Sequence, residues 1–194
     1  MKVIATALPD VLILEPRVFR DARGFFLESH NRAAFAEATG TDADFVQDNH
    51  SRSSKGVLRG LHYQISQPQG KLVRVLSGAV FDVAVDLRRA SPTFGHWTGA
   101  ELTGDNFLQM WVPAGFAHGF LVLSESADVH YKTTDYYAPA SERCLRWDDP
   151  ALGIQWPQVA GGPNLSAKDQ QGLALAEAEL FASDMAIQAR NRPS

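Results

Sequence analysis

The stretch KLVRVLSGAVFDVAVDLR, residues 71–88, decides the fold class. Apolar residues fill both of its halves, and Ser77-Gly78 separates them as the turn of a β-hairpin would. From Val80 to Leu87, one set of alternate residues is wholly apolar (Phe81, Val83, Val85 and Leu87), whereas the other includes Asp82 and Asp86. This is the two-residue period of a strand with two different faces. The stretch therefore predicts two strands joined as a hairpin.

Similar runs, rich in Val, Phe, Leu and Tyr and separated by Gly, Pro, Asn and Asp, continue on both sides of this stretch. They predict ten strands in all, at 11–15, 24–29, 44–49, 57–65, 71–77, 79–88, 95–102, 107–112, 119–124 and 128–136. Short strands at such regular spacing are typical of an antiparallel sandwich or barrel, and we expect an all-β jelly roll.

Two segments have helical sequences. Residues 29–40 are alanine-rich and end at Gly40, which suits a left-handed helix cap. Residues 166–182 carry strong helix formers after a Gly-Gly-Pro break, and they predict a C-terminal helix. We therefore expect a few short helices beside the sheets.

The composition suits one globular domain, because 194 residues with 45% hydrophobic content can bury a substantial core. We expect a single domain over 1–194, with a jelly-roll core at about 10–157 and a helical segment at about 164–190. The net charge of −4 argues against a nucleic-acid or membrane-surface binder, which usually carries a basic face. Cys144 is the only cysteine, so no intrachain disulfide forms, and the N-terminal apolar run is too short for a membrane span. These features predict a cytoplasmic protein.

Two histidines stand inside apolar, strand-like runs: His62 in VLRGLHYQ and His118 in PAGFAHGF. An imidazole has an unperturbed pKa of about 6.5, so it can take or release a proton at neutral pH. Arg59 and Lys71 lie near His62 in sequence, and a base beside cations suits proton removal next to a carbonyl of an anionic substrate. The alternatives are a hydrogen-bonded core histidine and, for Lys71, a solvated strand end.

A regular pleat would point Arg59 and His62 to opposite faces of their strand. A bulge at Gly60 would let both reach one cavity, and a glycine inside a strand often marks a bulge. Lys71, which begins the next strand, could stabilise an enolate oxygen.

Further residues have both a structural and a functional interpretation. Tyr131 is either a core aromatic or a group that returns a proton to a carbanion. Asp169 completes a capping box with Ser166, and it could also orient the ring of His62. Tyr137 lies in a polar loop, where it could stack on a base or cover the barrel mouth.

The pattern PxGxxH, which ends at His118, resembles part of the cupin signature. Metal-binding cupins combine such a histidine with an HxH pair and a glutamate, whereas this chain has His62-Tyr63-Gln64. Because the second histidine of the pair is missing, the usual ligand set cannot be assembled, and we expect no metal site of that kind.

Longer stretches resemble one family over almost the whole chain. They are RGFFLES at 23–29, FVQDNHSRS at 45–53, GVLRGLHYQ at 56–64, GKLVRV at 70–75, FDVAVDLRR at 81–89, PAGFAHGF at 113–120, YKTTDYYAP at 131–139 and LSAKD at 165–169. These stretches resemble the dTDP-4-dehydrorhamnose 3,5-epimerases, sugar-nucleotide epimerases of the rhamnose pathway that belong to the cupin superfamily.

The resemblance implies a cupin-type jelly roll, a homodimer whose subunits share site residues, and no metal or organic cofactor. It implies epimerisation at carbons 3 and 5 of dTDP-4-dehydro-6-deoxy-D-glucose. His62 would be the base, Tyr131 the acid, Lys71 the group that stabilises the enolate oxygen, and Asp169 the partner of His62. The implied substrate contacts are Arg23, Phe26, Glu28, Gln47, Asn49, Arg59, His118, Glu142 and Lys168, with Tyr137 stacking on thymine.

Three alternatives remain open at this point. An epimerase that inverts one centre, in a secondary-metabolite pathway, would use the same catalytic pair. A metal-dependent cupin oxygenase is disfavoured by the missing ligand. A sugar-binding module without catalysis is disfavoured by the complete set of His62, Lys71, Tyr131 and Asp169.

Overall fold

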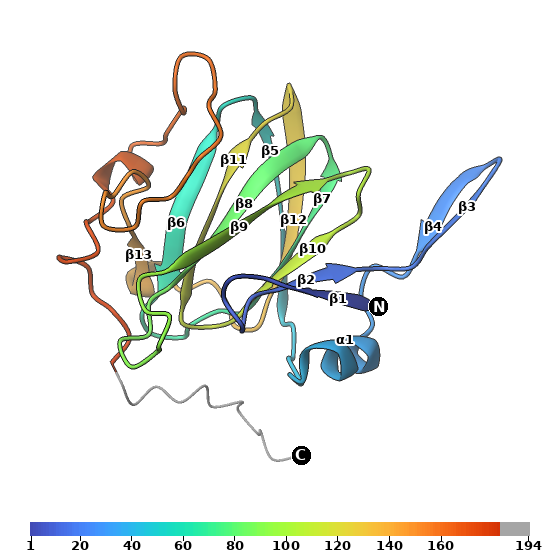
Figure 1. Cartoon of the computed structure of the whole chain (residues 1–194), viewed down its shortest axis with the longest axis horizontal. Helices are drawn as coiled ribbons and strands as arrows, with labels where there is room; N and C mark the ends of the chain where they lie inside the picture. Colours follow the sequence, from blue (N-terminus) through green and yellow to red (C-terminus); the bar gives the residue numbers. More distant parts are fainter. Residues whose placement is uncertain (183–194) are drawn as a thin grey trace.

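Two antiparallel β-sheets face each other in the computed structural model, which describes residues 1–182 (Figure 1). The strands are β1 (Lys2–Ala5), β2 (Leu12–Glu15), β3 (Val18–Asp21), β4 (Gly24–Leu27), β5 (Gln47–Ser54), β6 (Leu58–Gln64), β7 (Lys71–Ser77), β8 (Ala79–Asp86), β9 (Trp97–Thr103), β10 (Gln109–Val112), β11 (Phe116–Val122), β12 (Ser126–Thr133) and β13 (Glu142–Cys144). The described helices are α1 (Arg32–Thr39) and two short 3-10 turns, η1 (Pro139–Ser141) and η2 (Asp169–Gln171). The predicted all-β class is confirmed.

The six-stranded sheet has the order β1-β2-β10-β7-β12-β5, and the five-stranded sheet has the order β13-β6-β11-β8-β9. The main core lies between them. Val73 and Val129 of the larger sheet pack in one cluster with Ala84 and Phe120 of the smaller one, and all four are buried. Alternate residues of each strand therefore point inward, as the two-residue period requires.

The ten predicted strands all form, with shifted ends, but the predicted hairpin at 71–88 is wrong. β7 pairs with β10 and β12, whereas β8 pairs with β9 and β11 in the other sheet. At Gly78 (φ 79°) the chain crosses from one sheet to the other, and a Cβ there would lie 2.1 Å from the Ser126 carbonyl oxygen. The turn signal was real, but both strands find longer-range partners, which local sequence does not specify.

The first predicted helix is confirmed as α1. The Asn31 side chain accepts a hydrogen bond from the Ala34 N–H, and Gly40 ends the helix in the left-handed conformation (φ 68°). These are the caps that a short helix needs at its two ends. Phe35 is buried against Trp111, which fixes α1 below the larger sheet.

The predicted C-terminal helix is wrong within the described residues. From 166 to 182 only η2 is helical, and the rest of this segment follows the smaller sheet. Leu173 exchanges backbone hydrogen bonds with the chain around Leu145, and Phe181 is buried against Tyr63. These tertiary contacts outweigh helix propensity, which is worth only a fraction of a kcal/mol per residue. The predicted segment also includes 183–190, outside the described residues.

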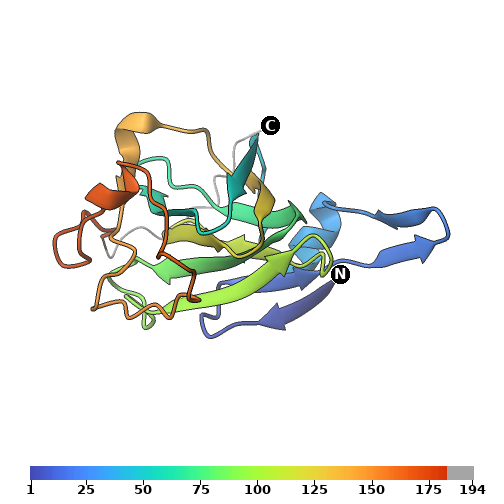
Figure 2. The same cartoon turned by 90° about the horizontal axis from the view of Figure 1, so that it is seen from above.

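A separate two-stranded hairpin, β3–β4, extends away from the sheets (Figures 1 and 2). The hairpin is exposed, with Phe26 of β4 at 70% relative accessibility. Sequence analysis did not predict β3, nor the short strands β1 and β13. No helix in residues 1–182 is long and apolar enough to cross a membrane.

Candidate active site

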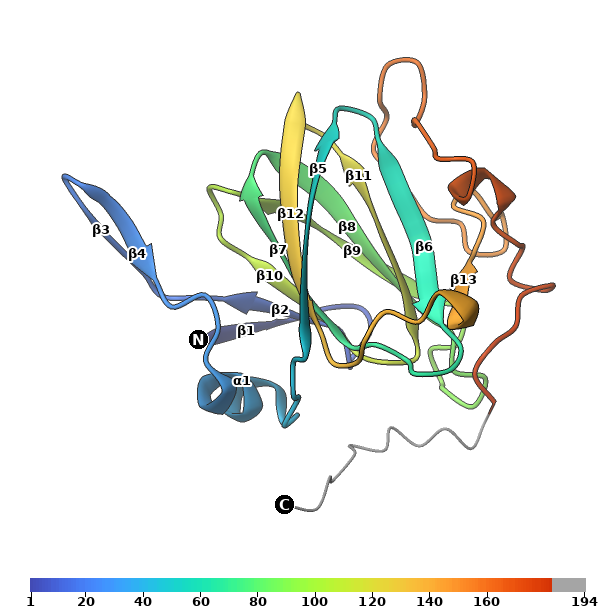
Figure 3. The ribbon, with the colours of Figure 1, turned by 180° about the vertical axis from the view of Figure 1, so that it is seen from behind.

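A pocket of about 180 Å³ opens between the two sheets. Figure 3 shows β5 and β12 on one side of the barrel and β6 on the other. Most of the predicted site residues line this pocket: Gln47, Asn49, Arg59, His62, Lys71, His118, Tyr131, Tyr137 and Glu142. Residues from strands far apart in the sequence thus form one site.

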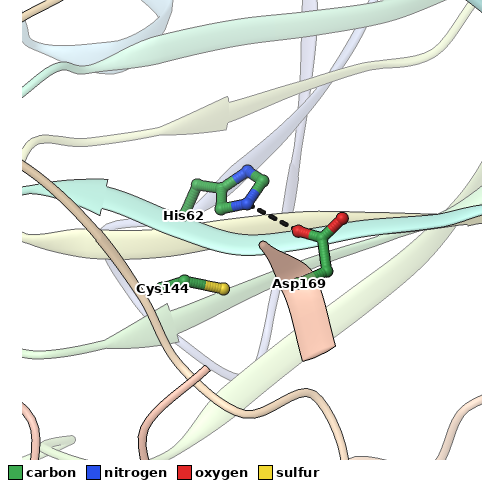
Figure 4. Close-up of side chains that lie close together, drawn as sticks. All are labelled: His62, Cys144 and Asp169. Carbon is green, nitrogen blue, oxygen red and sulfur yellow. Dashed lines mark ion pairs between the residues drawn. The ribbon is translucent and has the colours of Figure 1, made fainter. Parts of the chain in front are cut away.

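His62 lies on β6 beside the carboxylate of Asp169, with Nε2 2.7 Å from Oδ1 (Figure 4). The ring is not aligned for a linear hydrogen bond, and the contact becomes an ion pair when His62 is protonated. The Ser166 hydroxyl (2.6 Å) and the Gly60 N–H (3.2 Å) also donate to the carboxylate. Burial raises the pKa of Asp169, but these partners, His62 first, outweigh burial and lower it to about 2. The other nitrogen of the His62 ring points away from Asp169 (Figure 4).

A bulge at Gly60 brings Arg59 and His62 to the same cavity. His62 is opposite His118 in the register, but Arg59 is opposite Phe120, so β6 has one extra residue here. A Cβ on Gly60 would lie 2.6 Å from the Gly119 Cα. The predicted bulge is confirmed, and only glycine fits the close approach of the two strands.

Lys71 begins β7 on the opposite sheet, and the alternative interpretation of this residue as a solvated strand end is wrong. The residue is only 8% exposed, and its ammonium donates to the His62 carbonyl oxygen at 3.3 Å. Burial lowers the pKa of Lys71 to about 8, against the raising effects of Glu142 and Asp82. The ammonium therefore stays mainly charged at neutral pH, although it is buried.

Tyr131 faces the pocket from β12, so it belongs to the sheet opposite His62. Burial is the main cause that raises the pKa of Tyr131, so the phenol keeps its proton at neutral pH and can donate it. The ring of His118 lies 6.5 Å from the Tyr131 ring, centroid to centroid.

His118 itself is held by Asp82, whose Oδ1 lies 2.8 Å from Nε2, and both side chains are buried. Sequence analysis missed Asp82. The available signal was an acidic residue on a strand face otherwise occupied by Val80 and Ala84. A buried carboxylate on such a face requires a polar partner, which here is a histidine.

Glu142 joins two further predicted residues at the pocket mouth. It forms an ion pair with Lys168 and accepts a hydrogen bond of 2.6 Å from the Tyr137 hydroxyl. Burial raises the pKa of Glu142, but Lys168 and Tyr137 outweigh that effect and lower it. The Tyr137 N–H also donates to the Gln47 side-chain oxygen at 3.0 Å, so the loop holds its aromatic ring at the mouth.

Apart from Lys168, which reaches the pocket mouth through Glu142, three predicted substrate contacts lie outside the pocket of this chain. Arg23 and Phe26 belong to the β3–β4 hairpin, and Glu28 follows it. The guanidinium of Arg23 forms an ion pair with Asp21 at 2.6 Å in solvent. Within residues 1–182, nothing in this copy of the chain brings the three residues to His62.

The side chains that could hold a metal do not form the cupin set. Gln64, at the position of the missing histidine, donates its amide to two loop carbonyls, and its oxygen accepts from the Ala138 N–H. Within residues 1–182, a cluster of metal-ligating groups is formed by His62, Asp169 and Cys144. Burial, followed by Asp169, raises the pKa of the Cys144 thiol to about 12, so it is not a nucleophile at neutral pH.

The arrangement suits proton transfer at carbon. An imidazole held by a carboxylate faces the pocket from one sheet, while a phenol and a buried ammonium face it from the other. A base, an acid and a cation are what is needed to remove and return a proton next to a carbonyl.

Comparisons with known proteins agree with this chemistry. The model of the dTDP-4-dehydrorhamnose 3,5-epimerase family matches residues 5–177. The dTDP-4-dehydrorhamnose 3,5-epimerase of Pseudomonas aeruginosa is 63% identical over 181 residues, which cover 93% of this chain and 99% of that protein. A dTDP-4-dehydrorhamnose 3-epimerase of Streptomyces niveus is 40% identical over 92% of this chain and 86% of its own length.

A solved structure has the same fold. It is the dTDP-6-deoxy-D-glucose-3,5-epimerase of Legionella pneumophila in complex with dTDP-4-keto-L-rhamnose. The TM-score is 0.91 at 51% identity, over 93% of this chain and 97% of that one. The chain therefore belongs to the dTDP-4-dehydrorhamnose 3,5-epimerase family.

Proposed function

We propose that the pocket epimerises carbons 3 and 5 of dTDP-4-dehydro-6-deoxy-D-glucose and yields dTDP-4-dehydro-L-rhamnose. The observation that most directly supports this proposal is the placement of His62 and Tyr131 on opposite sheets that line one pocket. Inversion at carbon requires a proton to leave from one face and to return to the other. Two groups on opposite walls meet that requirement.

The ketone at carbon 4 acidifies the hydrogens on both neighbouring carbons. His62 takes one of them with the nitrogen turned away from Asp169, and the carboxylate stabilises the imidazolium. The electron pair of the broken C–H bond moves to the ketone oxygen, where the Lys71 ammonium stabilises the enolate. Tyr131 then protonates the opposite face of the carbon. Solvent then takes the proton from the His62 imidazolium and returns one to the Tyr131 phenolate, and the same steps at the second carbon complete the reaction.

The nucleotide lies across the pocket mouth in this proposal. The cavity of about 180 Å³ is smaller than the roughly 300–1,000 Å³ of typical ligand pockets, so the sugar enters and the rest of the substrate stays outside. Arg59 lines the pocket, and its guanidinium can bind pyrophosphate oxygens in a fork. Lys168 adds charge at the mouth, and the half-exposed ring of Tyr137 offers a face for the thymine.

We also infer a homodimer in which the β3–β4 hairpin of one subunit covers the pocket of the other. The hairpin extends away from its own sheets (Figures 1 and 3), and its Arg23 and Phe26 side chains are exposed to solvent. An aromatic ring at 70% accessibility next to exposed guanidinium groups suits an anionic nucleotide sugar held by a second copy.

Isotope exchange tests the reaction. The protein is incubated with dTDP-4-dehydro-6-deoxy-D-glucose in deuterated water, and NMR locates deuterium and configuration at each carbon. Deuterium at carbons 3 and 5 with formation of the L-sugar is expected. Deuterium at one carbon only would replace the proposal with the single-centre reaction, and deuterium at neither would refute it.

Subunit complementation tests the shared site. His62→Asn and Arg23→Ala each disable a different part of one composite site, so each homodimer should be inactive or nearly so. Mixed and refolded together, the two variants form heterodimers with one intact site, and activity should rise towards a quarter of the wild-type level. No recovery from a mixture that has exchanged subunits would contradict the sharing.

A further inference from the structure

Cys144 lies beside the pair formed by His62 and Asp169, and the proposed reaction makes no use of it. β13 pairs with β6 so that Cys144 is opposite His62 in the register. The His62 Nε2, the Cys144 Sγ and a carboxylate oxygen of Asp169 all lie within 4.8 Å of one another (Figure 4). Three different donor atoms, nitrogen, sulfur and oxygen, thus converge from β6, β13 and η2.

We propose that His62, Cys144 and Asp169 form a binding site for a thiophilic divalent cation of the zinc type, and that the bound ion inhibits the enzyme. Zn²⁺ prefers these three donor types, and catalytic-type zinc sites have three protein ligands and one open position. Of the three residues, His62 is the one that lines the substrate pocket.

The geometry is close to what the ion needs. With bonds of about 2.0–2.3 Å, tetrahedral zinc holds its ligand atoms roughly 3.3–3.6 Å apart. Nε2 and Oδ1 are 2.7 Å apart, so they must separate by about half an ångström, and Sγ must move closer. Cys144 is free to do so, because within residues 1–182 its sulfur makes one weak contact, at 3.4 Å to the Leu145 carbonyl.

The charges nearby limit the affinity. Asp169 supplies a full negative charge, held in place by Ser166 and Gly60. The Lys71 ammonium, which contacts the His62 carbonyl, opposes a second cation. We therefore expect weaker binding than at a structural zinc site, where no such cation is present.

The inhibition follows from the tautomer that the bound ion imposes on the His62 imidazole. This inference rests on the proposed function, in which His62 is the base. An imidazole that binds metal through Nε2 carries its remaining proton on the other nitrogen. In His62 that other nitrogen, which points away from Asp169, is the one that takes the substrate proton in the proposed function, so with the ion bound it can no longer accept a proton. The ion also takes up the carboxylate that would stabilise the imidazolium.

Cadmium titration tests the site without reference to catalysis. Cys144 is the only cysteine of the chain, so any thiolate-to-cadmium charge-transfer absorption must come from it. We expect this band to saturate at one Cd²⁺ per chain. Cys144→Ser should abolish it and weaken Zn²⁺ binding, measured by calorimetry, by at least about tenfold. His50→Gln, which alters a surface pair of histidine and Asp128, serves as a matched control and should change neither.

Activity measurements distinguish a failure of the metal site from a failure of the proposed epimerase function. Wild-type epimerisation should fall on addition of Zn²⁺ and recover with a chelator, while Cys144→Ser should remain active and lose most of the sensitivity. Absence of the cadmium band from the folded wild-type protein would overturn the metal site and leave the epimerase assignment intact. A saturating band without any loss of activity would show that the ion binds Cys144 without engaging His62, and it would overturn both the three-residue site and the inhibition. Cys144→Ala provides the same comparison if the serine variant folds poorly.

Discussion

Replacing Lys71 by methionine separates what the ammonium does for the reaction from what it does to the fold. Methionine keeps an unbranched side chain of similar length and removes the charge. Lys71 is buried at 8% exposure, and its polar contact within residues 1–182 is the His62 carbonyl at 3.3 Å. The substitution therefore takes away one hydrogen bond and one buried cation.

The structure predicts opposite effects on stability and activity. Burial lowers the pKa of Lys71 from 10.5 to about 8, which corresponds to about 3 kcal/mol against the charged form. Because the folded pKa lies below the unfolded one, this penalty is fully present at neutral pH and disappears as pH rises from about 8 towards 10.5. Lys71→Met removes this penalty but also loses a hydrogen bond worth about 1 kcal/mol. The substitution should therefore raise the free energy of unfolding at neutral pH by about 2 kcal/mol.

Activity should fall by about 10²–10³-fold in kcat, the usual effect of removing a group that stabilises an oxyanion. In the wild type, kcat at saturating substrate should decline as pH rises through about 8, where the ammonium is lost. Urea denaturation measures the first effect, and a pH series of NMR turnover assays measures the second. Lys55→Met is the control, because its ammonium pairs with Glu125 at the surface; stability should change by less than about 1 kcal/mol.

Two results would refute this reasoning. A Lys71→Met protein that keeps kcat within about tenfold of wild type does not need the cation for the enolate. A Lys71→Met protein that is less stable than wild type at neutral pH would show that the ammonium is not penalised by its burial.

His62→Asn should remove nearly all solvent exchange at both carbons, a loss of about 10²–10⁴-fold; a folded variant that keeps more than about a tenth of the exchange would exclude His62 as the base. Tyr131→Phe should allow deuterium incorporation but prevent inversion. An undiminished rate of L-sugar formation would contradict the proposal that Tyr131 protonates the face of the carbon opposite His62. Arg59→Lys and Tyr137→Ala should each weaken dTDP binding in calorimetry, since lysine cannot form the fork and alanine cannot stack; unchanged affinity in both would place the nucleotide elsewhere. Chelation of wild-type protein should not lower activity, and a loss restored by one added metal ion would favour a metal-dependent reaction.

Residues that act through local pattern could be predicted from the sequence. The strands follow from the two-residue period, α1 follows from its caps, and the bulge at Gly60 follows from a glycine inside a strand. His62 stood out because a polar group in an apolar strand needs a reason to be there, whereas the role of Tyr131 followed from the family resemblance.

Residues that act through long-range contact could not be predicted in this way. Lysine at a strand end is usually solvated, and only the packing of the second sheet over Lys71 makes it a buried cation. The partner of β7 is equally non-local, so Ser77-Gly78 suggested a hairpin where the chain changes sheets. The segment at 166–182 has helix propensity, but its backbone is already hydrogen-bonded to the chain around Leu145.

The bulge at Gly60 bears on how this pocket can diversify. Gly60 and Gly119 are fixed as glycines, because their backbones are in contact and a side chain on either would push β6 and β11 apart. The facing strand β5 has a single neighbour, β12, and turns Gln47, Asn49 and Ser51 into the cavity. Changes of substrate range should therefore accumulate along β5, while β6 stays constant, and libraries built to alter sugar preference are best placed there.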